Sequence, residues 1–334
     1  MYNELVKLLD PIYLVGGSVR DELLGRTPKD YDFATPYTPE EMERVFRKAG
    51  KRCYNIGKRF GTMGVKIKHG EEYQIVEVTT FRTEEYALGS RKPKVQFVSN
   101  LHQDLSRRDF TINSMAKRGY KLTDPFKGQE DLKNKIIRCV GNPRQRFKED
   151  PLRMLRAARF AAQLGFTIEA DTFKKMKERA HSILEVSKER WVVELDKLLL
   201  GENVRVGLNV LMETRLLSYM IPELSLQFKY IQNSNYHSLE LWEHTLKVVE
   251  QSPKNLDLRY ATLLHDVAKP FVRTENSKTG YSNYIKHDLL GAELVKKIAG
   301  YLKWSNERRD KVSDLVLNHL REDSSLKQWD DLAK

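Results

Sequence analysis

The sequence predicts an α+β domain followed by an all-helical remainder, in a chain of 334 residues. Over the first ~140 residues, short apolar runs that alternate with polar residues are typical of strands and lie between helical segments. From Asn142 onward the alternation fades, and leucines recur at helical spacing up to Tyr219. The length suffices for two or three domains. We expect a head at residues 1–140, a helical neck and body at 141–225, and a further helical domain at 226–334.

The composition is that of a basic, soluble protein. Charged residues make up 31% of the chain, and the formal net charge is +12, which favours a polyanionic partner such as nucleic acid. No apolar run is long enough to span a bilayer, and the N-terminal residues lack a signal-peptide pattern. Cys53 and Cys139 do not have the spacing of a metal site or a disulfide framework. We therefore expect a cytoplasmic protein with no membrane partner.

The first predicted strand, Tyr13–Val15, runs into a double glycine. Because Gly16 and Gly17 have no Cβ, their backbone N–H groups can approach an anion closely. Ser18 follows, and Arg20 adds a guanidinium suited to phosphate. The turn is therefore a candidate phosphate-binding site, although a glycine pair also marks ordinary turns.

The next predicted strand begins with two aspartates separated by one residue. Since side chains alternate along a strand, Asp30 and Asp32 point to the same face. Paired carboxylates are oxygen ligands of the kind that Mg²⁺ prefers. A phosphate site beside a metal-binding pair indicates nucleotidyl or phosphoryl transfer.

Two further strands, Thr62–Ile67 and Tyr73–Thr79, are separated by a hairpin-length connection that contains a glycine. Glu77 lies in the second strand among apolar residues, where an unpaired carboxylate would be costly to bury. It is a candidate third metal-site carboxylate, the alternative being that it points to solvent. The polar stretch Arg82–Pro93 then predicts a loop.

Two arginine-rich segments follow. The run Arg107–Asn113 reads RRDFTIN, and its charges could form only a surface salt bridge. Further on, Asp150 and Pro151 have the order of an N-cap and a first helical residue. The helix that they begin carries a drifting basic ridge at i, i+3 and i+6, made of Arg153, Arg156 and Arg159.

The order strand, glycine turn, helix and strand with two aspartates resembles the polymerase-β nucleotidyltransferase superfamily. GGSVRD, EVTTFR, RRDFTIN and the E-D-x-x-R-x-x-R segment resemble class II tRNA nucleotidyltransferases and bacterial poly(A) polymerases over residues ~12–220. The resemblance implies a polymerase-β-like head with a small mixed sheet, Mg²⁺ held by Asp30 and Asp32, and catalysis by these two with Glu77. It also implies that the nucleotide is bound by Gly16, Gly17, Ser18, Arg20, Arg108, Asp109, Asn113, Asp150, Arg153, Arg156 and Arg159.

In this family, Arg108 would contact the nucleotide, Asp109 the ribose hydroxyls, and Asp150 with Arg153 the Watson–Crick edge of the base. Protein would thus replace a template, with CTP, ATP and the 3′ end of tRNA as substrates and no DNA. The expected product is C, C and A, or the final A alone. In this family, a loop at 82–93 argues against an enzyme that adds the two C residues but not the final A. A processive poly(A) polymerase is the alternative.

The C-terminal third carries five of the eight histidines. His265 and Asp266 are adjacent at the end of an apolar helix, and with His244 and His287 they resemble the HD superfamily of metal phosphohydrolases. Such ligands accept Mn²⁺ or Ni²⁺. The final aspartate of that family is not identifiable, because Leu320 follows His319. Hydrolysis of 2′,3′-cyclic phosphates and a purely structural helical module are the alternatives. Relatives often continue further, so we expect a reduced or missing tRNA-binding tail.

Overall fold

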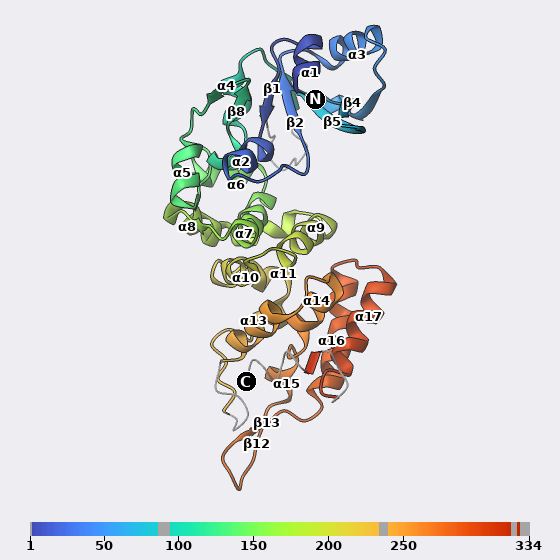
Figure 1. Cartoon of the computed structure of the whole chain (residues 1–334). Coiled ribbons are helices and arrows are strands. Elements are labelled where there is room, and N and C mark those ends of the chain that lie inside the picture. Colours follow the sequence, from blue (N-terminus) through green and yellow to red (C-terminus); the bar gives the residue numbers. More distant parts are fainter. Residues whose placement is uncertain (1, 86–93, 234–239, 322–325, 328–334) are drawn as a thin grey trace. The chain divides into compact units, whose positions relative to one another are not determined.

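The computed structural model describes residues 2–85, 94–233, 240–321 and 326–327 (Figure 1). The chain divides into two compact units, residues 1–150 and residues 151–334. A small mixed sheet lies in the first unit and the second is mostly helical, so the predicted fold class is confirmed. Within the described residues, no helix combines the length and the apolar character needed to cross a bilayer.

The first unit is built on a seven-stranded sheet with the order β3-β4-β5-β2-β1-β8-β9. Only β2 and β5 are parallel, and the other neighbours are antiparallel. The strands are β1 (Tyr13–Val15), β2 (Asp32–Thr35), β3 (Cys53–Gly57), β4 (Thr62–His69), β5 (Glu72–Thr80), β8 (Ala116–Arg118) and β9 (Lys121–Thr123). The predicted hairpin is confirmed, and its strands extend to a short turn at Gly70.

Part of the predicted polar loop is wrong. Arg82–Glu85 forms β6, which pairs in antiparallel fashion with β7 (Lys94–Phe97). Both strands are polar on their outer sides, and a polar sequence of this kind does not separate an exposed two-stranded ribbon from a loop. Residues 86–93 of the predicted loop lie outside the described residues.

The two faces of the sheet have different environments. Asp32 and Glu77 are partners across β2 and β5 and define what we call the carboxylate face. Phe33 and Leu14 are partners on the opposite face, where the ring of Tyr2 from α1 (Tyr2–Leu8) stacks on Phe33. Around β1 and β2 the carboxylate face is covered by α4 (Leu101–Ser106), whose Leu105 joins a core cluster with Val15, Ala34, Phe81 and Ala116.

The remaining helices of this unit surround the sheet (Figure 1). α3 (Pro39–Lys48) packs against β3 and β4, and it begins with a capping box between Thr38 and Glu41. The others are α2 (Gly17–Leu23), α5 (Gly128–Asn134) and α6 (Pro143–Glu149).

The arginine helix starts within one residue of the predicted position. Pro151, directly before α7 (Leu152–Leu164), already has helical dihedral angles, while Asp150 is extended and also ends α6. A residue before proline avoids the helical region because of the clash with the proline ring. The proline therefore separates two consecutive helices within the region from Asn142 onward that the sequence predicts as helical.

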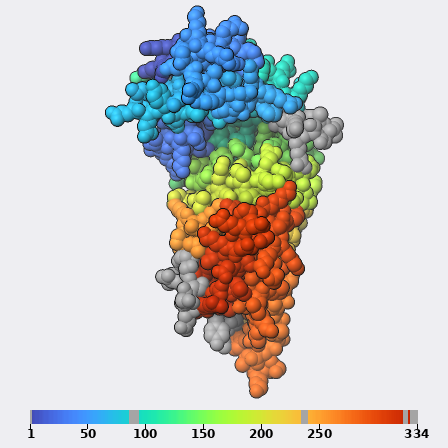
Figure 2. Space-filling view, turned by 90° about the vertical axis from the view of Figure 1, so that its right-hand side faces the viewer, coloured from blue at the N-terminus to red at the C-terminus, as the bar shows by residue number. Residues whose placement is uncertain are grey.

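The second unit contains helices α7 to α17. They are α8 (Ala170–Arg179), α9 (Lys188–Leu199), α10 (Val204–Glu213), α11 (Leu216–Met220), α12 (Pro222–Ser225), α13 (Leu241–Gln251), α14 (Leu256–Leu264), α15 (Lys269–Val272), α16 (His287–Tyr301) and α17 (Asn306–Leu317). A short hairpin, β12 (Thr274–Glu275) with β13 (Ser282–Asn283), extends from it. Helices α16 and α17 pack against each other, and their red surface faces the viewer in Figure 2.

Helices α7 and α10 approach closely at Gly207. A Cβ at this position would lie 2.6 Å from the Cβ of Ala162 and 2.8 Å from the carbonyl oxygen of Ala158. We therefore expect Gly207→Ala to lower the free energy of unfolding by about 1–3 kcal/mol through overpacking. Gly300, in α16, has no atom within 4 Å of such a Cβ. Gly300→Ala should be neutral or gain about 0.5–1 kcal/mol, because alanine loses less backbone entropy in a helix. Urea unfolding followed by circular dichroism measures both, and equal stability of the two variants would contradict the packing.

Candidate functional site

One buried hydroxyl holds the glycine turn and the aspartate pair together. Ser18 Oγ donates to the carbonyl oxygen of Asp30 at 3.0 Å and accepts from the backbone N–H of Asp32 at 3.1 Å. Ser18 is 2% exposed. The hydroxyl that the sequence assigned to nucleotide binding is therefore engaged in positioning the aspartates against the start of α2.

The carboxylates of the site face one another. Burial raises the pKa of Asp32, against the lowering effect of Arg108, and the charge of Asp30 adds to the rise. Partial burial raises the pKa of Glu77, and the charges of Asp32 and Asp30 raise it further. Like charges gathered in this way favour either protonation or a bound cation, and oxygen ligands fit a hard divalent ion.

Glu77 lies on the outer face of β5. Its side chain is partly exposed, in keeping with one of the two alternatives that the sequence left open, and its role as a metal-site carboxylate stays a prediction. The apolar neighbours Val76 and Val78 point to the opposite face and are almost fully buried. Glu77 is brought to Asp32 by the register of the parallel pair.

Glycine is required at position 16 on two counts. Its φ of +69° lies in the region that L side chains rarely adopt. A Cβ there would also lie 3.2 Å from Nη1 of Arg108. The glycine turn and the Arg107–Asn113 segment, which are distant in sequence, therefore meet at this point.

A second contact joins the same two segments. Arg20 Nη1 donates to Oδ1 of Asn113 at 2.8 Å, across 93 residues of sequence, and Arg20 Nε donates to Oδ1 of Asp21 at 2.9 Å. Asp109 accepts from Nδ2 of Asn113 at 3.2 Å and from the backbone N–H of Phe110 at 2.8 Å. Arg20, Asp109 and Asn113 are all buried. Predicted nucleotide-binding residues thus form one hydrogen-bonded network.

Sequence reasoning missed Asp104, which orients the two arginines. This fully buried carboxylate accepts from Arg107 Nη2 at 2.9 Å and from Arg108 Nη2 at 3.0 Å. Burial raises the pKa of Asp104, but the guanidinium groups of Arg108 and Arg107 outweigh it and hold the pKa below its usual range. The spacing of i to i+3 and i+4 on α4 is the signal that could have found it.

The arginines of α7 do not form a solvated ridge. Arg153 and Arg159 are 7% and 9% exposed. Arg159 Nε lies 2.5 Å from Oε2 of the buried Glu194 on α9, and Arg156 Nη1 lies 4.0 Å from Oε1 of the same residue. Asp150 ends the first unit and Arg153 belongs to the second, so their pairing around a base stays a prediction.

The four predicted metal-site residues of the C-terminal region are brought together. His244, His265, Asp266 and His287 are buried. Nε2 of His265 and Nε2 of His244 lie 3.2 and 3.5 Å from Oδ2 of Asp266, and Nε2 of His287 lies 3.3 Å from Oδ1. Lys269 Nζ is 2.7 Å from Oδ2. Burial raises the pKa of Asp266, but His265 and Lys269 outweigh it and hold the pKa well below its usual range.

His319 completes this cluster and was missed as a ligand. It follows α17, is 1% exposed, and its Nε2 lies 3.2 Å from Nε2 of His287. Burial, together with the charge of His265, lowers the pKa of His319 to about 4. His319 therefore adds a further imidazole to the cluster, one residue before Leu320, and nothing in the local sequence marked it as a ligand.

The ring orientations fit a metal ion. Nδ1 of His287 lies 2.7 Å from the carbonyl oxygen of Tyr284, and Nδ1 of His319 lies 2.6 Å from that of Val316. A carbonyl oxygen can only accept, so Nδ1 of each ring carries a proton, and Nε2 carries a lone pair wherever the ring is neutral. Two such lone pairs 3.2 Å apart repel unless a proton or a metal cation lies between them. The donor set is nitrogen-rich, as borderline transition metals prefer.

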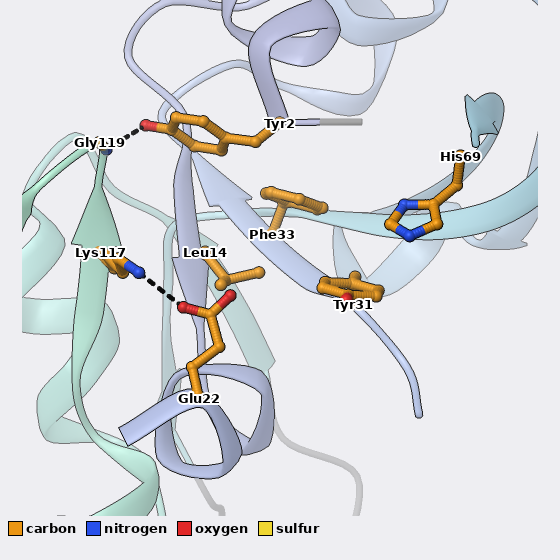
Figure 3. Close-up of a pocket in the computed structure, with 8 residues that line it drawn as sticks. All are labelled: Tyr2, Leu14, Glu22, Tyr31, Phe33, His69, Lys117 and Gly119. Atoms are coloured by element: carbon orange, nitrogen blue, oxygen red, sulfur yellow. Dashed lines mark hydrogen bonds and ion pairs between the residues drawn. The ribbon is translucent and has the colours of Figure 1, made fainter. Parts of the chain in front are cut away.

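A separate pocket of about 320 Å³ opens on the opposite face of the sheet (Figure 3). Tyr31, which lies between the two aspartates in sequence, faces this pocket. The centre of its ring is 5.6 Å from the centre of the His69 ring. A Lys117–Glu22 ion pair of 2.6 Å lies at its edge. The lining residues are Tyr2, Leu14, Glu22, Tyr31, Phe33, His69, Lys117 and Gly119, none of which is a predicted site residue.

Comparison with known protein families gives three matches along the chain. The poly(A) polymerase head domain matches residues 12–138, the probable RNA- and SrmB-binding site of polymerase A matches residues 165–227, and the HD domain matches residues 235–331. These segments coincide with the sheet-containing head, the helices after α7 and the histidine cluster.

Individual relatives agree with this assignment. The chain is 36% identical to a CCA-adding enzyme of Staphylococcus haemolyticus, over 98% of this chain and 79% of the relative. It is 45% identical to one of Staphylococcus aureus, over 85% and 73%. A crystal structure of the Bacillus stearothermophilus CCA-adding enzyme in complex with CTP is 30% identical, with a TM-score of 0.60, over 96% of this chain and 76% of that one.

The raised pKa of Asp32 predicts that its charge destabilises the metal-free fold. Between the pKa of an unfolded aspartate, about 3.9, and the higher folded value, stability falls as the proton is lost. Asp32→Asn should therefore raise the melting temperature of metal-free protein at pH 7–8, and the gain should vanish below about pH 3.9. Thermal unfolding in a chelator measures this. A variant less stable than wild type at neutral pH would show that the carboxylate is held by favourable contacts instead.

Proposed function

Because this chain belongs to the family of the CCA-adding enzymes, we propose that it transfers CMP and AMP from CTP and ATP to the 3′ ends of tRNA without a nucleic-acid template. The observation that carries the proposal is the assembly around Ser18. Its hydroxyl holds Asp30 and Asp32 beside the glycine turn, while the β2–β5 register adds Glu77. Carboxylates and a phosphate-binding turn then lie on one sheet, as metal-dependent nucleotidyl transfer requires.

The three carboxylates fit a hard divalent cation, and we assign Mg²⁺ to Asp30 and Asp32 with Glu77 as the third member. When bound, the metal would lower the pKa of the RNA 3′-hydroxyl and stabilise the leaving pyrophosphate. The protein supplies the geometry. Asp32 and Glu77 are on adjacent strands of a sheet rather than on loops, so their separation is set by backbone pairing.

We assign nucleotide binding to the hydrogen-bonded network that joins the glycine turn to the Arg107–Asn113 segment. The backbone of Gly16 and Gly17 and the guanidinium of Arg108 would bind the triphosphate, since Arg108 lies against the turn. Arg20 and Asn113 hold the turn to Asp109, which would bind the ribose hydroxyls. Hydrogen bonds to ribose hydroxyls are how a protein prefers ribonucleotides to deoxyribonucleotides.

We assign base selection to Asp150 and Arg153, and contacts near the phosphates to Arg156 and Arg159. The support is that Glu194 on α9 holds Arg159 of α7 in a fixed orientation. Hydrogen bonds to the Watson–Crick edge would then select C or A in place of a template base.

Incorporation of each labelled nucleotide into three tRNAs tests the function. The tRNAs end at the discriminator base, after the first C, and after both. We expect the first tRNA to gain C, C and A, the second to gain C and A, and the third to gain A alone. Extension of only the third tRNA would indicate an A-adding enzyme. Products extended by many A residues would indicate a poly(A) polymerase.

Asp30→Ala and Asp32→Ala should abolish addition and leave tRNA binding largely intact, because these carboxylates hold metal and not RNA. Near-wild-type turnover of either variant would refute the site.

A second function is favoured by the histidine cluster. We propose that His244, His265, Asp266 and His287, with His319, bind Mn²⁺ or Ni²⁺ and that this site hydrolyses 2′,3′-cyclic phosphates. The support is the pair of facing Nε2 lone pairs and the carboxylate between the rings. The metal would supply an activated water. Backbone carbonyls fix the rings of His265, His287 and His319 through Nδ1.

Replacing Asp266 and His287 together tests this site. We expect Asp266→Asn/His287→Ala to lose uptake of Ni²⁺ and Mn²⁺, the rise of melting temperature that these ions give, and any phosphate release, while nucleotide addition in Mg²⁺ is kept. His181→Ala, at an exposed histidine of the same unit, is the matched control. Metal analysis, thermal unfolding and phosphate release are measured together. Absence of metal uptake by wild type would refute the site, and uptake without phosphate release would leave a structural metal.

A further inference from the structure

An exposed apolar surface lies next to the carboxylates. Tyr73 and Ile75 alternate with Glu77 along β5 and share its face of the sheet, and they are 62% and 50% exposed. Ile56 of β3 is 48% exposed and reaches towards Ile75 across β4. A Cβ on Gly64 would overlap Ile56 and lie 3.3 Å from Cγ2 of Ile75. We call Ile56, Tyr73 and Ile75 the apolar shelf.

The exposure of the shelf is unlike the rest of the same strands. On the opposite face, five apolar side chains of β4 and β5 are at most 2% exposed: Met63, Val65, Ile67, Val76 and Val78. On the carboxylate face itself, the part around β1 and β2 is covered by α4. Contiguous apolar residues left exposed beside a site mark a surface that binds something.

Cationic groups border the shelf. In the β4–β5 register Lys66 is the partner of Ile75 and Lys68 is the partner of Tyr73, so both lysines begin on the same face. Lys66 Nζ lies 5.0 Å from the centre of the Tyr73 ring. Apolar and aromatic side chains for bases, with ammonium groups for phosphates, are the combination that binds single-stranded nucleic acid.

The direction of the reaction places the RNA on this side. In phosphoryl-type transfer the attacking and leaving oxygens lie in line on opposite sides of the reacting phosphorus. The strand order is β5-β2-β1, and the glycine turn with Arg108 follows β1. A triphosphate bound there leaves pyrophosphate on the β1 side. The attacking 3′-hydroxyl must then come from the β5 side, past Glu77, where the shelf begins.

We propose that the apolar shelf binds the last one or two nucleosides of the RNA acceptor. Their bases pack on Ile56, Ile75 and Tyr73, and their phosphates lie near Lys66 and Lys68. The inference rests on the proposed nucleotidyl transfer for its orientation. It adds a binding surface for the acceptor strand to a site otherwise defined by the nucleotide and the metal.

Kinetics of a double variant test the shelf. Ile56→Ala/Ile75→Ala removes apolar surface without adding charge, and we expect kcat/KM for tRNA to fall about tenfold or more through a higher KM. KM for ATP should stay within about twofold, because the triphosphate site is untouched. Leu23→Ala, at an α2 residue with 45% exposure, is the matched control. Circular dichroism checks that each variant is folded. Kinetics of the double variant equal to those of Leu23→Ala would overturn the proposal.

Photocrosslinking tests the same surface without requiring turnover. Ile75→p-benzoylphenylalanine should crosslink to the final two nucleotides of a labelled tRNA, and the same substitution at Leu23 should not. Crosslinks confined to internal nucleotides, or to protein alone, would overturn the proposal. If 3′-end crosslinks form but no nucleotide is added, the proposed function fails and the binding surface stands. If addition proceeds without these crosslinks, only the shelf is refuted.

Discussion

The site depends on one parallel strand pair and the hydroxyl that fixes its end. β2 and β5 are the only parallel neighbours in the seven-stranded sheet, and their register puts Asp32 opposite Glu77. Ser18 ties the backbone at Asp30 and Asp32 to the first turn of α2. Carboxylates that repel one another are thereby held close by backbone geometry. The pKa values of Asp32 and Glu77 are raised in part by this repulsion, which a bound divalent cation would reduce.

Buried acidic and amide groups orient the arginines of the site. Asp104 holds Arg107 and Arg108, Asn113 holds Arg20, and Glu194 holds Arg159. A buried ion pair adds little net stability, because desolvation offsets much of its attraction. Its value here is orientation, since a guanidinium with one edge engaged presents the other in a defined direction. The same principle applies in the histidine cluster, where backbone carbonyls fix the tautomer of three rings.

Local patterns in the sequence sufficed for β1, β2, β4 and β5, the glycine turn and the motifs, because these depend on residue type and on a period of two. The predicted hairpin is confirmed for this reason. The shorter or more polar strands β3, β6, β7, β8 and β9 were not predicted. Contacts between distant residues were not predictable. Nothing near Ser18 shows that its hydroxyl bridges Asp30 and Asp32, and nothing near His319 shows that it faces His287. For Glu77 the local alternation was informative: its apolar neighbours Val76 and Val78 are one residue away and therefore belong to the other, buried face.

The two candidate metal sites differ in the ligands that they offer, and this separates their chemistry. The head presents carboxylate oxygens on an exposed face of the sheet, where an ion can keep water and bind substrate phosphates. The histidine cluster is buried and dominated by imidazole nitrogens, with a single carboxylate between them. By ligand preference, Mg²⁺ suits the first site, and Mn²⁺ or Ni²⁺ suits the second. One chain can therefore carry both without competition for the same ion, and each site can be lost without the other because no ligand is shared.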